Sequence, residues 1–231
     1  ELKHDYNLEE LKYELVWSDE FNYVGKPDPG KWNFQVDGHG WGNNELQYYT
    51  AGDNAYVDGK KLILTARKEE KDGSKYTSTR MNTKGKGDWK YGRIEVRAKL
   101  SAGRGTWPAV WMLPTDWEND EWPASGEIDI MEHVGYDMGM IYGTVHTGAY
   151  NHMIRTDKGD SIKISNASQE FHVYAIEWLP DKIKFFVDDK VYFVYDPSKY
   201  STVITGEHWP FDRPFHLLIN IAIGGNWGGS R

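Results

Sequence analysis

The octet Gly126–His133, GEIDIMEH, places three carboxylates within six positions of an apolar, strand-like run. Acidic side chains are rare in such a run unless they are paired or take part in chemistry. Side chains alternate between the two faces of a strand, so Glu127 and Asp129 share a face, whereas strict alternation places Glu132 on the other. One extra residue near Ile130-Met131 would form a β-bulge and return Glu132 to the first face. The octet therefore predicts a bulged β-strand with three carboxylates on one face.

The spacing of these carboxylates favours one class of reaction. With the bulge, the Cα atoms of Glu127 and Glu132 lie about 13 Å apart, and side chains that lean together bring the carboxyl groups to roughly 5–6 Å. Retaining glycosidases hold a nucleophile and an acid/base at about that separation, whereas inverting enzymes hold the pair wider to admit a water. Asp129 between them would hydrogen-bond Glu127 and separate the two pKa values. The alternative is a salt-bridged acidic strand at the edge of a solvated sheet.

Length and charge limit the other possibilities. The 231 residues suit one domain, residues 1–231, and contain no repeat or linker that would mark a boundary. The formal net charge of −8 argues against nucleic acid and anionic membranes as partners. No cysteine is present, which excludes disulfides and thiolate chemistry. No apolar run approaches the roughly 18 residues of a transmembrane helix. The first residues do not form a signal peptide, so an exported protein would have lost that signal.

The hydrophobic pattern has the period of two that is typical of half-buried antiparallel strands. In Arg93–Leu100, apolar residues alternate with charged ones. Similar or more fully apolar runs predict strands at Tyr13–Trp17, Leu62–Arg67, His172–Trp178, Lys182–Val187 and Phe215–Ile223. Turn signals such as Asp58-Gly59 and Asp72-Gly73 separate the runs. Many strands, regular turns and almost no helical pattern predict an all-β sandwich or barrel.

Aromatic residues make up 15% of the chain, including 11 Trp. Trp107 and Trp111 lie at even spacing, so in a strand both indoles share a face while Val110 and Met112 point to the core. Because sugar rings have apolar faces that stack on indoles, the pair suggests a platform for a carbohydrate. The alternative is that both indoles only fill a β-sheet core, as most of the other aromatic residues are expected to do.

His146 follows a predicted turn at Tyr136–Gly139, which would fold residues 141–148 back antiparallel to the acidic strand. This pairing places His146 opposite residues 129–132 and within reach of Glu132. An imidazole there would hydrogen-bond the acid/base or a sugar hydroxyl. The alternative is a purely structural histidine.

These motifs together resemble family 16 of the glycoside hydrolases, and within it the endo-β-1,3-glucanases called laminarinases. The similarity extends from Tyr13–Phe21 to Gly224–Trp227, nearly the whole chain. Ala124–Glu132 matches the bulged form of the family's catalytic motif, which is a highly specific signal. Agarases and carrageenases of the family share the bulge, whereas lichenases typically lack the extra residue. In combination with Trp107–Met112 and the polar run Asn43–Thr50, the chain looks most like a laminarinase.

The resemblance implies a β-jelly roll, a sandwich of two antiparallel sheets whose concave sheet forms an open cleft for a long glucan. Glu127 matches the nucleophile of the family, Asp129 the assisting carboxylate and Glu132 the acid/base. The positions that match substrate contacts are Asn44, Arg80, Trp107, Trp111, Trp122, His146 and Trp227. No cofactor is expected for catalysis.

The resemblance also implies a structural calcium ion on the convex side, near Glu20 and the carbonyl of Gly59, since hard oxygen ligands suit that ion. The family normally continues beyond Gly224–Trp227 with a final strand that returns beside the N-terminal one and carries a calcium-binding Asp. Here the sequence stops at Arg231. We therefore expect a domain truncated at its C-terminus, with that strand missing and calcium absent or weakly bound, unless another chain supplies the strand.

The function expected from these observations is endo-acting, retaining hydrolysis of β-1,3-glucan, with mixed β-1,3/1,4-glucan as a further substrate. The expected protein is a secreted monomer that binds no nucleic acid and no membrane. Two alternatives stay open. One is a β-glucan-binding recognition module, although such modules characteristically lose the catalytic Glu pair that is present here. The other is a family 16 hydrolase that acts on a red-algal galactan.

Overall fold

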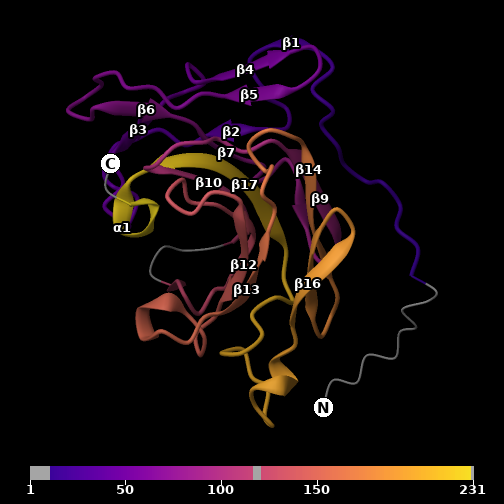
Figure 1. Ribbon diagram of the computed structural model, residues 1–231. Helices are drawn as coiled ribbons and strands as arrows, with labels where there is room; N and C mark the ends of the chain where they lie inside the picture. Colours follow the sequence, from indigo (N-terminus) through magenta and orange to yellow (C-terminus); the bar gives the residue numbers. More distant parts are fainter. Residues whose placement is uncertain (1–10, 117–120, 230–231) are drawn as a thin grey trace.

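β-strands form nearly all of the regular structure in residues 11–116 and 121–229, the parts of the chain that the computed structural model describes (Figure 1). The first strands are β1 (Val24–Gly25), β2 (Asn33–Phe34), β3 (Gln47–Tyr49), β4 (Ala55–Asp58), β5 (Leu62–Leu64), β6 (Tyr76–Ser78), β7 (Arg80–Asn82), β8 (Asp88–Trp89) and β9 (Gly92–Ala98). They are followed by β10 (Thr106–Pro114), β11 (Glu127–Glu132), β12 (Met140–His146), β13 (Lys158–Lys163), β14 (His172–Trp178), β15 (Ile183–Val187), β16 (Lys190–Tyr195) and β17 (Phe215–Ile223). The described helical elements are short: η3 (His152–Ile154), η4 (Pro197–Lys199) and α1 (Gly225–Gly228). None of the described helices is long and apolar enough to cross a membrane.

The larger sheet has the strand order β13-β12-β11-β10-β17-β7-β2, with β8 also paired to β17, and it curves strongly (Figure 1). Its longest pair is β10 with β17, in antiparallel register from Thr106↔Ile223 to Pro114↔Phe215. The bounds of β17 are those predicted from its apolar run. Because β10 lies between β17 and the acidic strand β11, this pair supports the strand that carries the carboxylates.

A second sheet, in the order β16-β15-β14-β9, packs against the convex side of the larger one, and the hydrophobic core lies between the two. Met112, Ile128 and Val145 enter this core from the larger sheet, and Tyr174 and Phe185 enter it from the smaller one. All five side chains are fully buried. The predicted all-β sandwich of two antiparallel sheets is therefore confirmed, and its concave face points away from the core.

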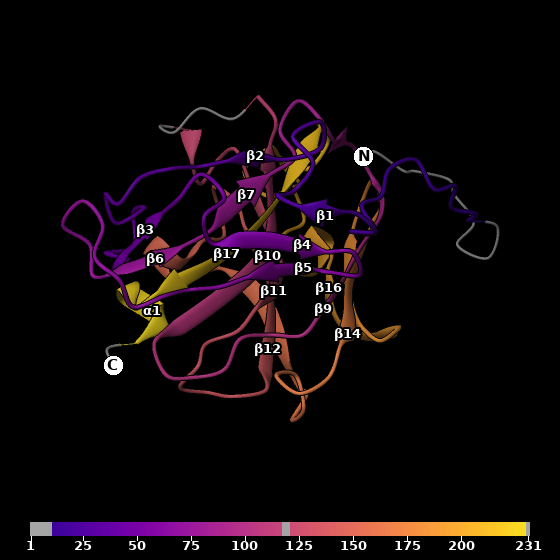
Figure 2. The same cartoon turned by 90° about the horizontal axis from the view of Figure 1, so that it is seen from above.

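Two small sheets complete the described fold. The antiparallel sheet β1-β4-β5 lies at the top of the molecule in Figure 1, near β2 and β7, and faces the viewer in the view from above (Figure 2). The other small sheet is the parallel pair of β3 and β6. The sequence did not predict this parallel pair, because each of its strands has only three residues and shows no clear period.

The predicted β-bulge is present at Ile130-Met131. The registers Asp129↔Thr144 and Glu132↔Tyr142 leave two residues of β11 opposite one residue of β12, and the register against β10 shifts at the same place. Ile130 and Met131 are 0% and 1% exposed, so both side chains enter the core in succession. The bulge thereby returns Glu132 to the concave face.

The prediction of a strand at Tyr13–Trp17 is wrong. No strand forms in residues 11–23, and Leu15 and Val16 are 79% and 77% exposed, because this segment has no sheet neighbour with which to pair. Within the described residues, β9 pairs only with β14 and forms an edge of the smaller sheet. The strand predicted at Leu62–Arg67 is shorter than expected, since β5 ends at Leu64. The expectation that a final strand is missing stays a prediction.

Gly143 lies opposite the bulge and has no room for a side chain. A Cβ atom there would lie 2.7 Å from Cδ1 of Phe185 and closer still to the hydroxyl of Tyr192. We therefore expect Gly143→Ala to lower the free energy of unfolding by about 1–3 kcal/mol, measured by urea denaturation. Gly206→Ala is the matched control, because a Cβ at Gly206 would meet nothing within 4 Å. Equal stability of the two variants would contradict this account of the bulge.

Candidate active site

Glu127, Asp129 and Glu132 lie together on the concave face, as the bulge predicts. Asp129 is 3% exposed, and the two Glu residues are half-buried. Asp129 hydrogen-bonds with both Glu127 and Glu132. Because an ionised carboxylate is only an acceptor, two carboxyl groups can bond each other only if one of them is protonated. The strand therefore presents three carboxyl groups that share protons. Asp129 lies between Glu127 and Glu132, as the sequence predicts.

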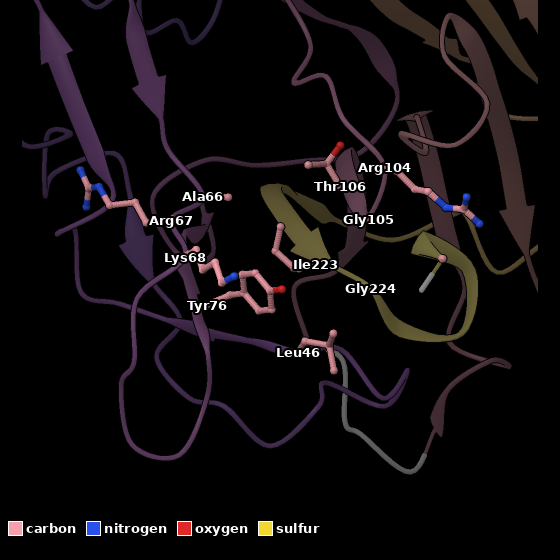
Figure 3. A pocket seen from close by; sticks show the side chains of 11 residues that line it. Leu46, Ala66, Arg67, Lys68, Tyr76, Arg104, Gly105, Thr106, Ile223 and Gly224 are labelled. Atoms are coloured by element: carbon pink, nitrogen blue, oxygen red, sulfur yellow. The ribbon is translucent and has the colours of Figure 1, made fainter. Parts of the chain in front are cut away.

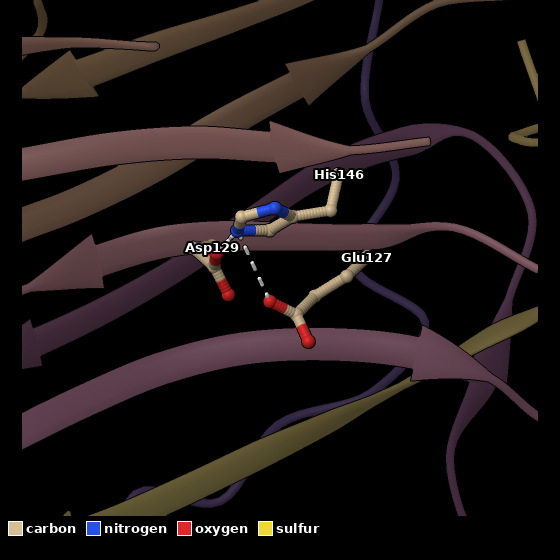
Figure 4. Close-up of side chains that lie close together, drawn as sticks. All are labelled: Glu127, Asp129 and His146. Atoms are coloured by element: carbon tan, nitrogen blue, oxygen red, sulfur yellow. Dashed lines mark ion pairs between the residues drawn. The ribbon is translucent and has the colours of Figure 1, made fainter. Parts of the chain in front are cut away.

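His146, the last residue of β12, lies directly opposite Glu127. Its Nε2 atom is 3.2 Å from Oδ2 of Asp129 and 3.6 Å from Oε2 of Glu127 (Figure 4). The predicted antiparallel return of the chain is confirmed, but the predicted register is wrong, because His146 contacts these two acids rather than Glu132. The register differs because the connection between β11 and β12 is longer than the predicted turn at Tyr136–Gly139. This connection begins at His133, whose buried ring accepts a backbone N–H of the same loop at 2.9 Å.

Burial raises the pKa of all three carboxyl groups. For Glu127 the neighbouring Asp129 adds to the rise in pKa, while the nearby His146 and the positive charge of Arg80 oppose it. Burial, followed by the charge of Glu132, raises the pKa of Asp129 well above its usual value. Burial and the charge of Glu127 raise the pKa of Glu132 to about 8. At neutral pH Glu132 therefore holds a proton, which is what general acid catalysis requires.

The predicted Trp pair on β10 lies on the concave face, and each indole N–H bonds one polar group. Trp107 Nε1 donates to Oε2 of Glu132 at 3.0 Å, and Trp111 Nε1 donates to Oδ1 of Asn220 at 2.8 Å. The residues that alternate with the two indoles are buried in the core as predicted: Val110 and Met112. The alternative in which both indoles only fill the core is therefore wrong.

Arg80 lies between two aromatic rings. Its guanidinium carbon is 4.6 Å from the ring centre of Trp41 and 4.7 Å from that of Trp111. Its Nε atom donates to Oε1 of Gln35 at 2.7 Å, and the residue is only 9% exposed. The two cation–π contacts and the hydrogen bond hold the planar guanidinium in one orientation. The sequence alone would have placed this arginine on the surface.

Three residues of the site were not singled out by the sequence: Trp41, Gln35 and Asn220. Asn220 interrupts the apolar strand β17, is 7% exposed, and donates from Nδ2 to the hydroxyl of Tyr49 at 3.1 Å. Such an interruption is a usable signal, because a buried amide is costly unless its groups are bonded. Trp41 and Gln35 lie in irregular segments between short strands, where no periodic pattern marks them.

The remaining predicted contact residues surround these groups. Asn44 donates from Nδ2 to Oδ1 of Asn226 in α1 at 2.8 Å. Trp227, also in α1, packs edge-on against Trp107 with ring centres 5.5 Å apart. The ring of Trp122 lies 5.9 Å from that of His146. The structure thus brings the predicted substrate-contact residues into one connected set with the carboxylates, and their contact with sugar stays a prediction.

The predicted calcium ligands are Glu20 and the carbonyl of Gly59. In the described parts of the chain, no group of three His, Asp or Glu side chains includes Glu20. The adjacent Asp19 is engaged within the protein, since its carboxylate accepts bonds from Trp32 Nε1 and the Tyr23 hydroxyl. Calcium takes about six to eight oxygen ligands, so Glu20 and the Gly59 carbonyl would need several further oxygen ligands. The calcium site stays a prediction, and no catalytic step depends on it.

Two cavities lie away from the carboxylates. One, of about 210 Å³, is lined by residues such as Leu46, Tyr76 and Thr106, and the charged ends of Arg67 and Arg104 point away from its centre (Figure 3). The other, of about 690 Å³, lies between the loops that precede β11 and β17. Neither cavity is lined by an acidic residue of β11, so the chemistry belongs to the concave sheet face.

The raised pKa of Glu132 makes a prediction for stability. Between the ordinary value of 4.5 and the folded-state pKa of about 8, the folded protein binds more protons at this residue than the unfolded chain. The free energy of unfolding should therefore fall as the pH rises through this interval. Glu132→Gln should flatten the fall in thermal midpoint, whereas the exposed Glu70→Gln should leave it unchanged. Identical slopes in Glu132→Gln and the wild type would contradict a protonated Glu132.

Comparison with known proteins relates this chain to a family of glycosyl hydrolases and to glucanases. The family described as glycosyl hydrolases family 16 matches residues 42–231. A beta-glucanase of Rhodothermus marinus is 55% identical over 225 residues, which cover 95% of this chain and 78% of that protein. The glucan endo-1,3-beta-glucosidase A1 of Niallia circulans is 40% identical over 94% of this chain, but the match covers only 35% of that longer protein.

Solved structures agree with this relationship. The laminarinase of Rhodothermus marinus superposes with a TM-score of 0.91 at 54% identity, covering 94% of this chain and 89% of that one. A mutant of SCLam, a non-specific endo-beta-1,3(4)-glucanase co-crystallised with an oligosaccharide, superposes with a TM-score of 0.88 at 43% identity, covering 94% and 86%. With a family match over most of its length and the three carboxylates on one bulged strand, the chain belongs to family 16 of the glycosyl hydrolases.

Proposed function

We propose that this protein is an endo-acting, retaining hydrolase of β-1,3-glucan that also accepts mixed β-1,3/1,4-glucan. The observation that carries the proposal is the bulged strand, which puts Glu127, Asp129 and Glu132 on one face. The names of relatives support the substrate. The Niallia enzyme and a 39% identical enzyme of Cryptopygus antarcticus are glucan endo-1,3-beta-glucosidases, and SCLam is described as a non-specific endo-beta-1,3(4)-glucanase.

In the first half of the reaction, the carboxylate of Glu127 attacks the anomeric carbon while Glu132 gives its proton to the departing glycosidic oxygen. His146 and the positive charge of Arg80 support the ionised nucleophile, because both lower the pKa of Glu127 that burial raises. The pKa of Glu132, about 8, keeps this residue protonated for the step. The product of this half is a sugar held to Glu127 as an ester.

In the second half, a water oxygen bonds to the anomeric carbon, Glu132 takes the proton of that water, and the ester bond to Glu127 breaks. The ester carries no charge, so the charge of Glu127 no longer raises the pKa of Glu132. Glu132 therefore ionises more readily and is suited to act as the base. Two displacements at the same carbon leave the sugar with its original configuration.

The face beside the carboxylates suits a long sugar chain. Trp41, Arg80 and Trp111 form a continuous stack of flat groups, and Asn44 lies next to α1 on the same side. We also infer that the protein acts as a monomer outside the cell. A polymer too large to enter a cell must be cut outside it, and the two carboxyl groups that the displacements use, Glu127 and Glu132, lie on one strand of one chain.

Two relatives define the outcomes that compete with this proposal. A keratan-sulfate endo-1,4-beta-galactosidase of Sphingobacterium multivorum is 35% identical, and a beta-1,3-glucan-binding protein of Penaeus monodon is 38% identical over 66% of this chain. The presence of both Glu127 and Glu132, with the pKa of Glu132 raised to about 8, favours hydrolysis over binding alone. Sugar release should therefore be compared on laminarin, lichenan, agarose, carrageenan and keratan sulfate. We expect laminarin to be cut fastest. Sugar release from agarose, carrageenan or keratan sulfate but not from laminarin would refute β-glucan as the substrate.

Glu127→Ser should abolish hydrolysis while glucan binding is retained, because it removes the nucleophile without altering the aromatic stack. Reducing-sugar release measures the first effect, and calorimetric titration with a laminarioligosaccharide measures the second. Glu70→Ser, on the exposed surface, is the control for the change of residue type. Turnover of Glu127→Ser at the wild-type rate would refute the role of Glu127. For the wild type, NMR should show the β-anomer as the first product, as retention requires.

Arg80→Lys should raise KM for long glucans more than it lowers kcat. A lysine ammonium lacks the planar guanidinium that lies between the two Trp rings, so the stack beside the carboxylates loses its shape while the reacting groups stay in place. Arg97→Lys is the matched control, because Arg97 also lies over an aromatic ring, that of Phe171, but on the convex side. Equal KM values for the two variants would argue against Arg80 as a substrate contact.

A further inference from the structure

Trp107 contacts the acid/base of the proposed reaction through its indole N–H. The N–H group donates to Oε2 of Glu132 at 3.0 Å, and Trp107 supplies the one nitrogen-bound hydrogen that reaches this carboxyl group in the described residues. An indole N–H can donate but never accept. The bond is therefore strongest when Glu132 is ionised, and it lowers the pKa of this residue against the effect of burial.

The indole of Trp107 is held in place from several sides. Trp227 packs edge-on against it with ring centres 5.5 Å apart, and Tyr142 packs edge-on against Trp227 at 5.1 Å. The Tyr142 hydroxyl in turn donates to Oδ2 of Asp137 at 2.9 Å. A Cβ atom at Gly228 would lie 3.3 Å from Cβ of Trp107, so the turn of α1 already packs closely on the residue. The N–H therefore points at Glu132 before any substrate is present.

The other groups around Glu132 are acidic. Glu127, on the same strand, raises the pKa of Glu132 by its charge, and so does Asp157, which precedes β13. Asp129 lowers this pKa through a hydrogen bond. From β16 beneath the bulge, the hydroxyl of Tyr192 has no hydrogen-bond partner, and the charge of Glu132 contributes to the raised pKa of this tyrosine. None of these groups favours the ionised form of Glu132 by its charge. The hydrogen bonds from Trp107 and from Asp129 favour it instead, and of these two donors only the indole of Trp107 does not titrate.

We propose that Trp107 is a positioning residue for Glu132: its N–H orients the carboxyl group and supports the ionised form that accepts the proton of water, and Trp227 braces the indole. The inference rests on the proposed function for the meaning of that proton transfer. It also changes the interpretation of Trp227, which acts through Trp107 on the acid/base. The two displacements then differ in their need for Trp107, because only the second requires an ionised Glu132.

Trp107→Phe keeps an aromatic ring and removes the donor. We expect the pH at which Glu132 titrates to rise by about one unit, since a hydrogen bond to a charged group commonly contributes that much. With a glucan substrate, the alkaline limb of the pH profile of kcat/KM should move to higher pH. An aryl laminaribioside has a good leaving group, so the second displacement limits its rate. With this substrate the acid limb of the pH profile of kcat should move to higher pH as well. A merely structural change would lower both rates without moving either limb.

Trp111→Phe is the matched control, because it removes an indole N–H that bonds Asn220 and not a carboxyl group. It should leave both limbs where they are in the wild type, whatever it does to KM. Trp227→Leu keeps the donor but removes its brace, and it should move both limbs in the same direction by a smaller amount. If the pH profiles of Trp107→Phe match those of the wild type, the proposal is refuted. If those of Trp227→Leu match the wild type, Trp227 does not hold the indole of Trp107 in place.

A direct titration separates this proposal from the proposed function. Carbon-13 NMR of protein labelled at the Glu carboxyl groups, with the Glu132 signal assigned by Glu132→Gln, reports the titration of Glu132 without any turnover. Replacement of Trp107 by benzothienylalanine, which has the shape of Trp but no N–H, covers the case in which Trp107→Phe fails to fold. A raised midpoint supports the proposal, and an unchanged midpoint refutes it. Absence of hydrolysis by the wild type would refute the proposed function alone.

Discussion

The burial of two consecutive apolar side chains, Ile130 and Met131, is the contact on which the site depends. Each fully buried side chain of this size contributes roughly 1.5–3 kcal/mol relative to exposure, and both are lost if the strand slips by one residue, because a slip exchanges the two faces. The core therefore holds the register of β11. The carboxyl groups on the opposite face keep their mutual positions because the residues beneath them cannot move.

The same packing explains the electrostatics of the concave face. Three acidic groups close to a well-packed sheet lose most of their water, and burial is the largest cause of the raised pKa of each. The surrounding groups then give the carboxyl groups different environments. His146 and Arg80 support charge on Glu127, whereas Trp107 supports it on Glu132 without a positive charge of its own.

The sequence predicted the parts of this molecule that depend on local alternation. The bulge followed from one residue out of phase, and β14 and β17 followed from apolar runs whose ends coincide with those of the strands. The register of His146 was wrong because it depends on the length of a connection, which alternation does not encode. Tyr13–Trp17 shows the same limit, since an apolar run forms a strand only where a neighbour is present to pair with it.

The contacts of Arg80 could not be predicted, because they join three segments that are far apart in the chain. Trp41, Trp111 and Gln35 each contribute one contact, and none of them lies near Arg80 in the sequence. Such assemblies are a property of the folded sheet. By contrast, the polar Asn220 in an apolar strand was visible in the sequence, although its partners were not.

The stacking of Arg80 between two rings has a consequence for the thermodynamics of recognition. A free arginine side chain loses about 2 kcal/mol of rotamer entropy when it becomes ordered, and an exposed arginine would lose it each time a ligand arrives. Here the ordering takes place once, when the chain folds. A ligand that meets the guanidinium therefore finds a rigid surface, and its affinity is reduced less by conformational entropy than the length of the side chain would suggest.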